Sequence, residues 1–356
     1  MTTLDIAHHR LYNQQISHTK CTTPAEVVAW LGAVQAQDYP GAKWSIALRL
    51  PSGTNGDIEQ AIADKTIIRT WPMRGTLHFV AAADIRWMLA LLTPRIIAGS
   101  TLRHQRLELD EAIFARCKEL FTKVLQGGKQ LTRDEMYAVL EQNTISTAGQ
   151  RGYHILWRSA QEGLICFSAL RDKQQTFALL DEWVPNAQNM ERDQALAELA
   201  KRYFTSRGPA TVQDFAWWSG LKISDARVGL EMVKSQLVQE TIAGQTYWMP
   251  NISISQSSST TVHLLPGFDE YVLGYKDRSA VLDPMHAAKI CPGNNGMFMP
   301  TIVINGRIVG IWKRTLKKHT VVMTPSPFTA LTATENHVFS TAAGHYGTFL
   351  DLPVIL

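Results

Sequence analysis

A pattern that recurs three times constrains the fold most: a helical stretch leads directly into two short strand-like runs. In each copy, apolar residues spaced about 3.6 apart give way to runs rich in Ile, Val, Phe, Thr and Tyr around a short turn. The copies share hydrophobic period rather than residue identity, and they occupy residues 58–80, 153–180 and 225–249. Because a repeated unit rarely arises by accident, we expect one architecture to recur along the chain.

Further helical sequence precedes each copy. Thr23 before Pro24, Thr132 with Glu135, and Thr211 are signals for helix starts. We expect helices over residues 4–17, 24–34, 110–126, 132–142, 191–206 and 211–219. Two or three helices followed by a β-hairpin make a winged helix, a variant of the helix-turn-helix.

Helical periodicity largely stops near residue 250. A Ser/Thr-rich stretch, 251–261, precedes short runs typical of strands, and one helix is expected near 328–344. The expected strands include residues 262–266, 271–275, 296–306 and 348–356. We therefore predict an α+β fold of three tandem winged-helix units and a β-rich barrel or sheet domain, with boundaries at 1–105, 106–187, 188–252 and 253–356.

The composition excludes several classes of protein. With 356 residues, 45% of them hydrophobic and 19% charged, the chain is typical of a globular protein. No apolar run reaches the roughly 18 residues of a membrane span, and the N-terminus is unlike a signal peptide, so we expect a cytoplasmic protein. The net charge of +4 is too small to indicate a polyanionic partner by itself.

Motifs for cofactors and metals are absent from the sequence. The four cysteines lie far apart without a CxxC pair, and there is no GxGxxG, GxxxxGK[ST], HExxH or GxSxG pattern. We expect no cofactor and no metal.

The most informative stretch is LGAVQAQDYPGAKWSIALRL, residues 31–50. A helix is expected to end near Val34, and Gln35 and Gln37 follow with i, i+2 spacing, which puts both amides on one side of an extended segment. Two amides can hold one water through a donor and an acceptor together. The alternative is that the pair only caps a helix or supports a turn.

A second stretch, RTWPMRGTLHFV, lies on the first predicted wing. Arg69 and Arg74 suit phosphate contacts, and Trp71 suits a wedge between bases. The alternatives are a core position for Trp71, a solvated turn for Arg74, and a buried, hydrogen-bonded ring for His78.

These stretches, with LLPGFDEYVLGYKDRS and GRIVGIWKRT further on, resemble the AlkZ-type winged-helix proteins over nearly the whole chain. That family includes DNA glycosylases that remove bulky alkylated bases and unhook interstrand crosslinks. Its characteristic Gln–apolar–Gln motif corresponds to Gln35, Ala36 and Gln37. The resemblance implies that Gln35 and Gln37 are catalytic and position the hydrolytic water.

The resemblance also implies the reaction. An N7- or N3-alkylated purine is cationic and leaves readily, so positioned water and stabilisation of an oxocarbenium-like transition state suffice. Asp38 and His78 are candidates for electrostatic or positioning support. We expect a monofunctional, monomeric enzyme that acts on double-stranded DNA, with phosphate contacts from Lys43, Arg69, Arg74, Arg151 and Arg158 and a contact from Trp71.

Two other functions are consistent with the sequence. The first is a non-catalytic winged-helix DNA-binding protein such as a transcription factor, because a fold alone does not establish a chemistry. The second is a protein that sequesters a small genotoxin. The sequence leaves open the preferred lesion, base flipping, a toxin-resistance or general repair role, and the role of Asp269, Glu270 and Tyr271, for which we expect a structural function.

Overall fold

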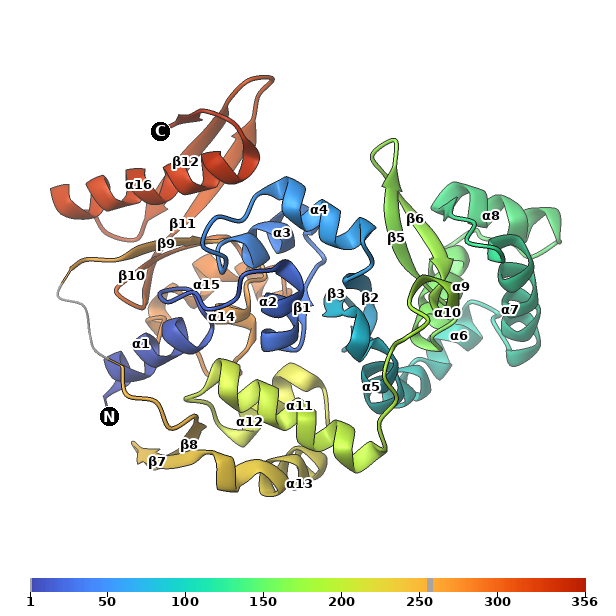
Figure 1. The fold of residues 1–356 in the computed structure, drawn as a ribbon, viewed down its shortest axis with the longest axis horizontal. Coiled ribbons are helices and arrows are strands. Elements are labelled where there is room, and N and C mark those ends of the chain that lie inside the picture. Colours follow the sequence, from blue (N-terminus) through green and yellow to red (C-terminus); the bar gives the residue numbers. More distant parts are fainter. Residues whose placement is uncertain (1, 255–258) are drawn as a thin grey trace. The chain divides into compact units, whose positions relative to one another are not determined.

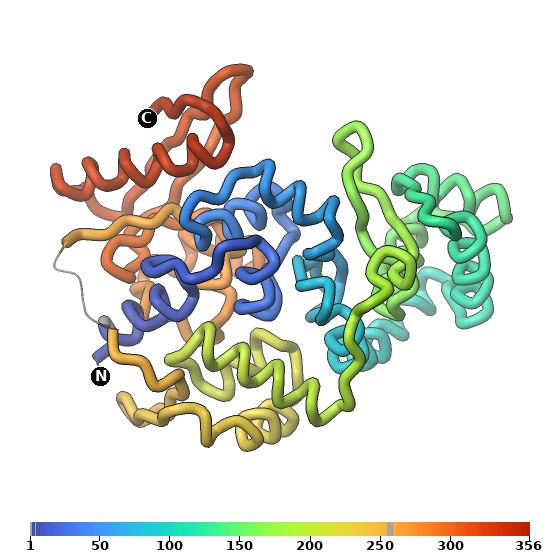
Figure 2. The backbone as a smooth tube through the Cα atoms, viewed as in Figure 1, coloured from blue at the N-terminus to red at the C-terminus, as the bar shows by residue number. Residues whose placement is uncertain are grey.

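The structure is a computed structural model that describes residues 2–254 and 259–356, so the predicted Ser/Thr-rich stretch lies partly outside the described residues. The chain forms two compact units (Figures 1 and 2). The first unit joins the residues up to Ile58 to those from Leu196 onward, and the second is Glu59–Ala195. Helix and sheet are both present in each unit, as the predicted α+β class requires.

The first unit contains helices from both ends of the chain. They are α1 (Thr3–Asn13), α2 (Pro24–Leu31), α3 (Tyr39–Ala47), α12 (Val212–Ser219), α13 (Ile223–Val233), α14 (Glu270–Leu273), α15 (Ala287–Ile290) and α16 (Ala333–Leu350). Helices α4 (Asn55–Ala63) and α11 (Arg192–Arg207) include the positions at which the chain passes from one unit to the other.

A five-stranded sheet forms the C-terminal part of the first unit. Its strands are β9 (Val262–Leu265), β10 (Thr301–Ile304), β11 (Arg307–Leu316), β12 (Val321–Pro327) and β13 (Val354–Ile355), in the order β13-β12-β11-β10-β9. Neighbours are antiparallel except for β12 and β13. Helix α16 runs along this sheet (Figure 1). Apolar side chains of α1, such as Ile6 and Leu11, share a core with Leu265 and Val303.

The remaining strands of the first unit are short. They are β1 (Val34–Gln35) and the hairpin of β7 (Val238–Ile242) and β8 (Gln245–Met249).

The second unit packs helices against antiparallel strands. Its helices are α5 (Ile85–Gly99), α6 (Thr101–Arg106), α7 (Glu111–Leu125), α8 (Arg133–Gln142), α9 (Arg151–Gln161) and α10 (Leu180–Trp183). Its strands β3 (Thr76–Ala81), β2 (Ile67–Met73), β5 (Ile165–Arg171), β6 (Gln174–Leu179) and β4 (Leu131–Thr132) are neighbours in that order. Residues of α7, α8, α9 and these strands form one apolar core.

The recurring pattern predicted from the sequence is present in the structure. Hairpins β2–β3, β5–β6 and β7–β8 each follow a helix, and each turns through two residues with positive φ. This is the geometry of a two-residue turn that matches the twist of the strands. The helix starts predicted at Thr23, Thr132 and Thr211 are also confirmed, and the capping box predicted at Thr132 and Glu135 is present.

Two predicted elements near the C-terminus are wrong. Residues 271–275 do not form a strand, because the Asp269 side chain accepts the backbone N–H of Tyr271 and begins α14. The run is buried on all sides, so its hydrophobic pattern does not distinguish a helical turn from a strand. The last helix extends to Leu350, so only Val354–Ile355 of the expected final strand pairs with a neighbour.

Among the residues that the structure describes, no helix combines the length and apolar character needed to cross a membrane.

Candidate active site

The segment that contains the two glutamines connects α2 to α3 in the first unit. Helix α2 ends at Gly32, whose φ of 74° lies in the left-handed region that favours glycine. The extended pair Val34–Gln35 follows, and α3 begins after Asp38 with Pro40 in its first turn. A helix end, an extended segment and a helix start thus fix the direction of residues 35–37.

The two glutamine side chains contact each other, as their spacing predicts. The Nε2 atom of Gln35 donates to Oε1 of Gln37 over 2.5 Å. Gln35 is 7% exposed and Ala36 is fully buried, whereas Gln37 is exposed. This hydrogen bond uses the amino group of Gln35 and the carbonyl of Gln37. The other polar group is the side-chain carbonyl in Gln35 and the side-chain amino group in Gln37.

A buried ion pair fixes the backbone of this segment. The Oε1 atom of Glu270 accepts the backbone N–H of Gln35 over 3.0 Å. Its Oε2 atom accepts from Nη2 of Arg207 over 2.6 Å and from the indole N–H of Trp218 over 2.8 Å. The side chains of Arg207 and Glu270 are both 0% exposed. The motif is therefore anchored to α14, α11 and α12.

A second buried pair lies beside the first. Arg49 donates to both carboxylate oxygens of Asp269 over 3.0 and 2.9 Å, and Ser45 on α3 donates to the same carboxylate over 2.7 Å. Burial alone would raise the pKa of Asp269, but the charge of Arg49 and hydrogen bonds from Arg49, Ser45 and the Tyr271 backbone lower it below its usual value.

The Asp38 carboxylate lies at the start of α3. A Cβ atom on Gly41 would come within 2.3 Å of its Oδ2 atom, so the carboxylate folds back over the first turn of the helix. Arg314 of β11 approaches its Oδ1 atom to 3.8 Å and also contacts the hydroxyl of Tyr346. Asp38 is thus a partly exposed anion beside Gln37 and near one cation.

Lys43 is the other candidate in this segment. It is 6% exposed, and its Nζ atom lies 4.7 Å from the ring centroid of Tyr39, one turn earlier on α3. This arrangement is a cation–π contact within the helix.

The remaining candidates belong to the second unit. Arg69 is 7% exposed and donates to Gln175 over 3.0 Å. Trp71 is 3% exposed and packs against Phe167, with ring centroids 5.1 Å apart. Trp71 therefore occupies the core position that the sequence left as its alternative.

Arg74 and His78 form a pair at the turn of the first hairpin. Nδ1 of His78 lies 2.9 Å from the carbonyl of Thr76, and Nε2 lies 3.3 Å from the Arg74 guanidinium. Because a carbonyl only accepts, Nδ1 carries the hydrogen and Nε2 accepts from Arg74. His78 is fully buried, so this contact orients Arg74, which is partly exposed.

Arg151 and Arg158 on α9 are engaged by the protein itself. Arg151 donates to the carbonyls of Ser146 and Glu108 over 3.0 Å each. Arg158 is 9% exposed and forms ion pairs with Glu111 over 3.2 Å and with Glu162 over 2.5 Å. These contacts favour a role in holding the second unit together.

No group of three or more His, Cys, Asp or Glu side chains within residues 2–254 and 259–356 is arranged to hold a metal ion.

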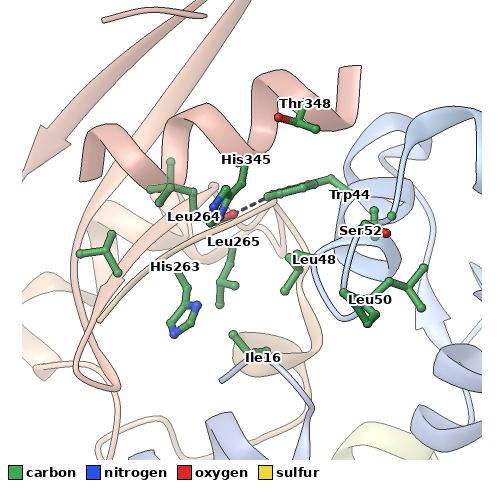
Figure 3. Close-up of a pocket in the computed structure, with 15 residues that line it drawn as sticks. Ile16, Trp44, Leu48, Leu50, Ser52, His263, Leu264, Leu265, His345 and Thr348 are labelled. Carbon is green, nitrogen blue, oxygen red and sulfur yellow. Dashed lines mark hydrogen bonds between the residues drawn. The ribbon is translucent and has the colours of Figure 1, made fainter. Parts of the chain in front are cut away.

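A cavity of about 380 Å³ lies between α3, β9 and α16 (Figure 3). Trp44 forms part of its wall and donates to the carbonyl of Leu264 over 2.7 Å. His345 lies on the Leu264 side of β9, whereas His263 points toward Ile16 and Leu265. Neither Gln35 nor Gln37 lines this cavity, so it is separate from the glutamine pair.

Sequence reasoning missed Arg207 and Trp218 as parts of the site. The available signal was the acidic pair Asp269–Glu270 inside an apolar run, because buried carboxylates require partners. The identity of those partners was not deducible, since Arg207 and Trp218 lie more than 50 positions earlier in the chain.

Comparisons with known proteins agree with one another. The family described as "DNA glycosylase AlkZ-like" matches residues 28–349. The "Interstrand DNA cross-link repair glycosylase" of Streptomyces sahachiroi is 27% identical over 342 residues, which cover 90% of this chain and 89% of that protein. The solved structure of Streptomyces sahachiroi DNA glycosylase AlkZ has a TM-score of 0.81 and 24% identity, with 100% of this chain and 99% of that chain covered.

One prediction follows from the buried imidazole of His263. Burial, with the charges of Arg49 and His345, lowers the pKa of His263 to about 4 from an ordinary 6.5, and its Nε2 atom has no hydrogen-bond partner among the residues that the structure describes. The His263 imidazole therefore binds a proton below about pH 6.5 in the unfolded chain, but only below about pH 4 in the folded chain. The contribution of this group to the free energy of unfolding is fully present above pH 6.5 and is lost as the pH falls toward 4.

Urea unfolding of wild type and His263→Leu at pH 7.5 and pH 5.5 measures this effect. The wild type is expected to lose about 1 kcal/mol more than the variant between the two pH values. The matched control is His337→Leu at an exposed position of α16, which is expected to behave as wild type. Equal losses in wild type and His263→Leu would contradict the prediction.

Proposed function

The chain belongs to the AlkZ-like family of DNA glycosylases, hydrolases of N-glycosyl bonds, and we propose that Gln35 and Gln37 position the attacking water. The observation that carries this proposal is the 2.5 Å contact between the two amides on a segment whose backbone is fixed. One amide is buried and the other exposed, so the pair extends from a rigid support toward solvent.

The chemistry of an amide pair selects the substrate. Amides orient a water but are poor bases, so they suit a leaving group that departs without strong assistance. N7- and N3-alkylpurines meet this condition because they carry a positive charge. An undamaged base does not, and normal DNA is therefore spared.

Asp38 adds electrostatic support. Positive charge develops on the sugar as the base leaves, and a fixed carboxylate beside the water stabilises it. Arg314 lies 3.8 Å from one oxygen of this carboxylate.

We propose a monofunctional enzyme without lyase activity. Water is the nucleophile, so no lysine has to form a Schiff base with the sugar. The lysine in the motif segment, Lys43, is buried against Tyr39.

Three winged-helix units, at residues 1–105, 106–187 and 188–252, hold the DNA. The β-rich domain follows them in the chain, at residues 253–356. The three hairpins with the same turn geometry support this organisation. Arg74, at the turn of the first hairpin, is the strongest candidate for a phosphate contact because His78 orients it and solvent reaches it.

The substrate is double-stranded DNA with alkylated bases, and interstrand cross-links are included because the curated relative is named for their repair. We place the enzyme in the cytoplasm as a monomer.

Catalysis is expected to depend on both glutamines. Gln35→Ala and Gln37→Ala are each expected to slow release of N7-methylguanine from duplex DNA about 100-fold in single turnover, because the water loses one of its two holders. Affinity for the duplex, measured by fluorescence anisotropy, is expected to stay within about twofold of wild type.

The matched control is Gln60→Ala at an exposed position of α4, which is expected to release the base at the wild-type rate. Near-normal base release by the Gln35 and Gln37 variants would refute the role of the pair. A wild type that releases neither N7-methylguanine nor a bulkier N7 adduct would refute the proposed substrate class.

DNA binding is expected to depend on Arg74 and not on Arg158. Arg74→Gln is expected to weaken binding and to reduce the slope of log affinity against log salt by about 1, because one phosphate contact is lost. Arg158→Gln is expected to leave the slope unchanged and to lower the melting temperature, since Glu111 and Glu162 lose their partner. The reverse outcome for the two variants would show that the DNA contacts are misassigned.

A further inference from the structure

We propose that Glu270 is a positioning residue for base release: its carboxylate sets the direction of the Gln35 side chain by holding the Gln35 backbone. This inference rests on the proposed role of Gln35 and Gln37, and it gives a role to the acidic pair in the FDEY stretch. Glu270 itself is fully buried, so it acts through Gln35 and not on the substrate.

Glu270 and Arg207 together hold the segment at alternate residues. Arg207 donates to the carbonyl of Leu31 over 2.6 Å and to the carbonyl of Ala33 over 3.1 Å. Glu270 accepts the N–H of Gln35 over 3.0 Å and binds Arg207 over 2.6 Å. The backbone at residues 31, 33 and 35 is thus attached to one charge pair.

The surroundings make this attachment rigid. The side chains of Arg207 and Glu270 are excluded from water, and hydrogen bonds to charged groups in a buried site are stronger than those between neutral groups. Trp218 binds the same carboxylate oxygen, and its ring lies 3.5 Å from the position that a Cβ atom on Gly32 would occupy. A rotation of the segment would therefore break several contacts at once.

Asp269 holds the helix that follows the motif. Its carboxylate accepts from Ser45 on α3 and from Arg49 four residues later, while its Oδ1 atom caps α14. Adjacent acidic residues thus attach the extended segment and the following helix to the same short helix α14.

Catalysis by a positioned water depends on such rigidity. A displacement of about 1 Å at a reacting group is enough to slow a reaction about 100-fold. Side chains in an extended segment alternate in direction, so the orientation of the Gln35 backbone fixes the side on which its amide lies. If the Gln35 N–H lost its partner, both glutamines would still be present, but the Gln35 side chain would no longer be held in its orientation.

The test compares full-length wild type with Glu270→Asp and Glu270→Gln. Aspartate retains the charge that Arg207 requires but is one methylene too short to reach the Gln35 N–H. Both variants are expected to release N7-methylguanine at least about 10-fold more slowly per folded molecule in single turnover, with duplex affinity within about twofold of wild type. If Glu270 serves stability alone, the Glu270→Asp variant releases the base at the wild-type rate per folded molecule.

Hydrogen exchange provides a readout that does not depend on activity. The backbone amides of residues 33–37 are expected to exchange at least about 10-fold faster in both Glu270 variants than in wild type. The matched control is Asp214→Asn, which makes the same carboxylate-to-amide change at a residue that is 1% exposed. The partners of Asp214 are Thr211, Lys276 and Asp277, outside this segment, so it is expected to leave exchange of residues 33–37 and the rate per folded molecule near wild type.

The outcomes separate this inference from the proposed function. Wild-type exchange in residues 33–37 of the Glu270 variants, or faster exchange with a wild-type rate of base release, overturns the positioning role. A wild type that releases no base from either adduct overturns the proposed function. In that case the exchange rates alone still decide whether Glu270 holds the segment.

Discussion

The ion pair between Arg207 and Glu270 is the interaction on which the rest of the first unit depends. It joins helix α11, the short helix α14 and the backbone at the start of the glutamine motif. A buried ion pair adds little net stability compared with apolar side chains, because both charges lose their hydration. It does specify one arrangement, since loss of either partner leaves an uncompensated buried charge that costs about 3–5 kcal/mol. We interpret the pair as a device for geometry rather than for stability.

This geometry agrees with the demands of the proposed reaction. A cationic base leaves without a strong acid, so the protein has to supply a held water and a nearby negative charge. Gln35, Gln37 and Asp38 are polar residues within four positions that also include the buried Ala36, and the two buried charge pairs hold the segment on which they lie. In the second unit, His78 holds Arg74 in a comparable way at the turn of a hairpin. Both units thus use buried polar groups to orient side chains that solvent can reach.

The sequence predicted what depends on neighbouring residues. Thr23 and Thr132 mark helix starts because their caps involve residues three positions later, and the two-residue turns lie between strands that are adjacent in the chain. The contact between Gln35 and Gln37 was likewise deducible from their spacing. The ion pair of Arg207 with Glu270 was not, because it joins residues 63 positions apart through the fold. Nor does the sequence show that Arg158 is paired with Glu111. Because of this pairing, a cation of the kind that contacts DNA is instead used within the protein.

The most direct test of the central claim is a crystal structure of the protein with duplex DNA that carries a cationic aza-sugar in place of the damaged nucleotide. Such a sugar mimics the charge of the transition state. We predict one ordered water within hydrogen-bond distance of both the Gln35 and Gln37 amides and next to the sugar carbon, with the Asp38 carboxylate close to the sugar. A water held by other residues, or glutamine side chains directed away from the sugar, would contradict the account.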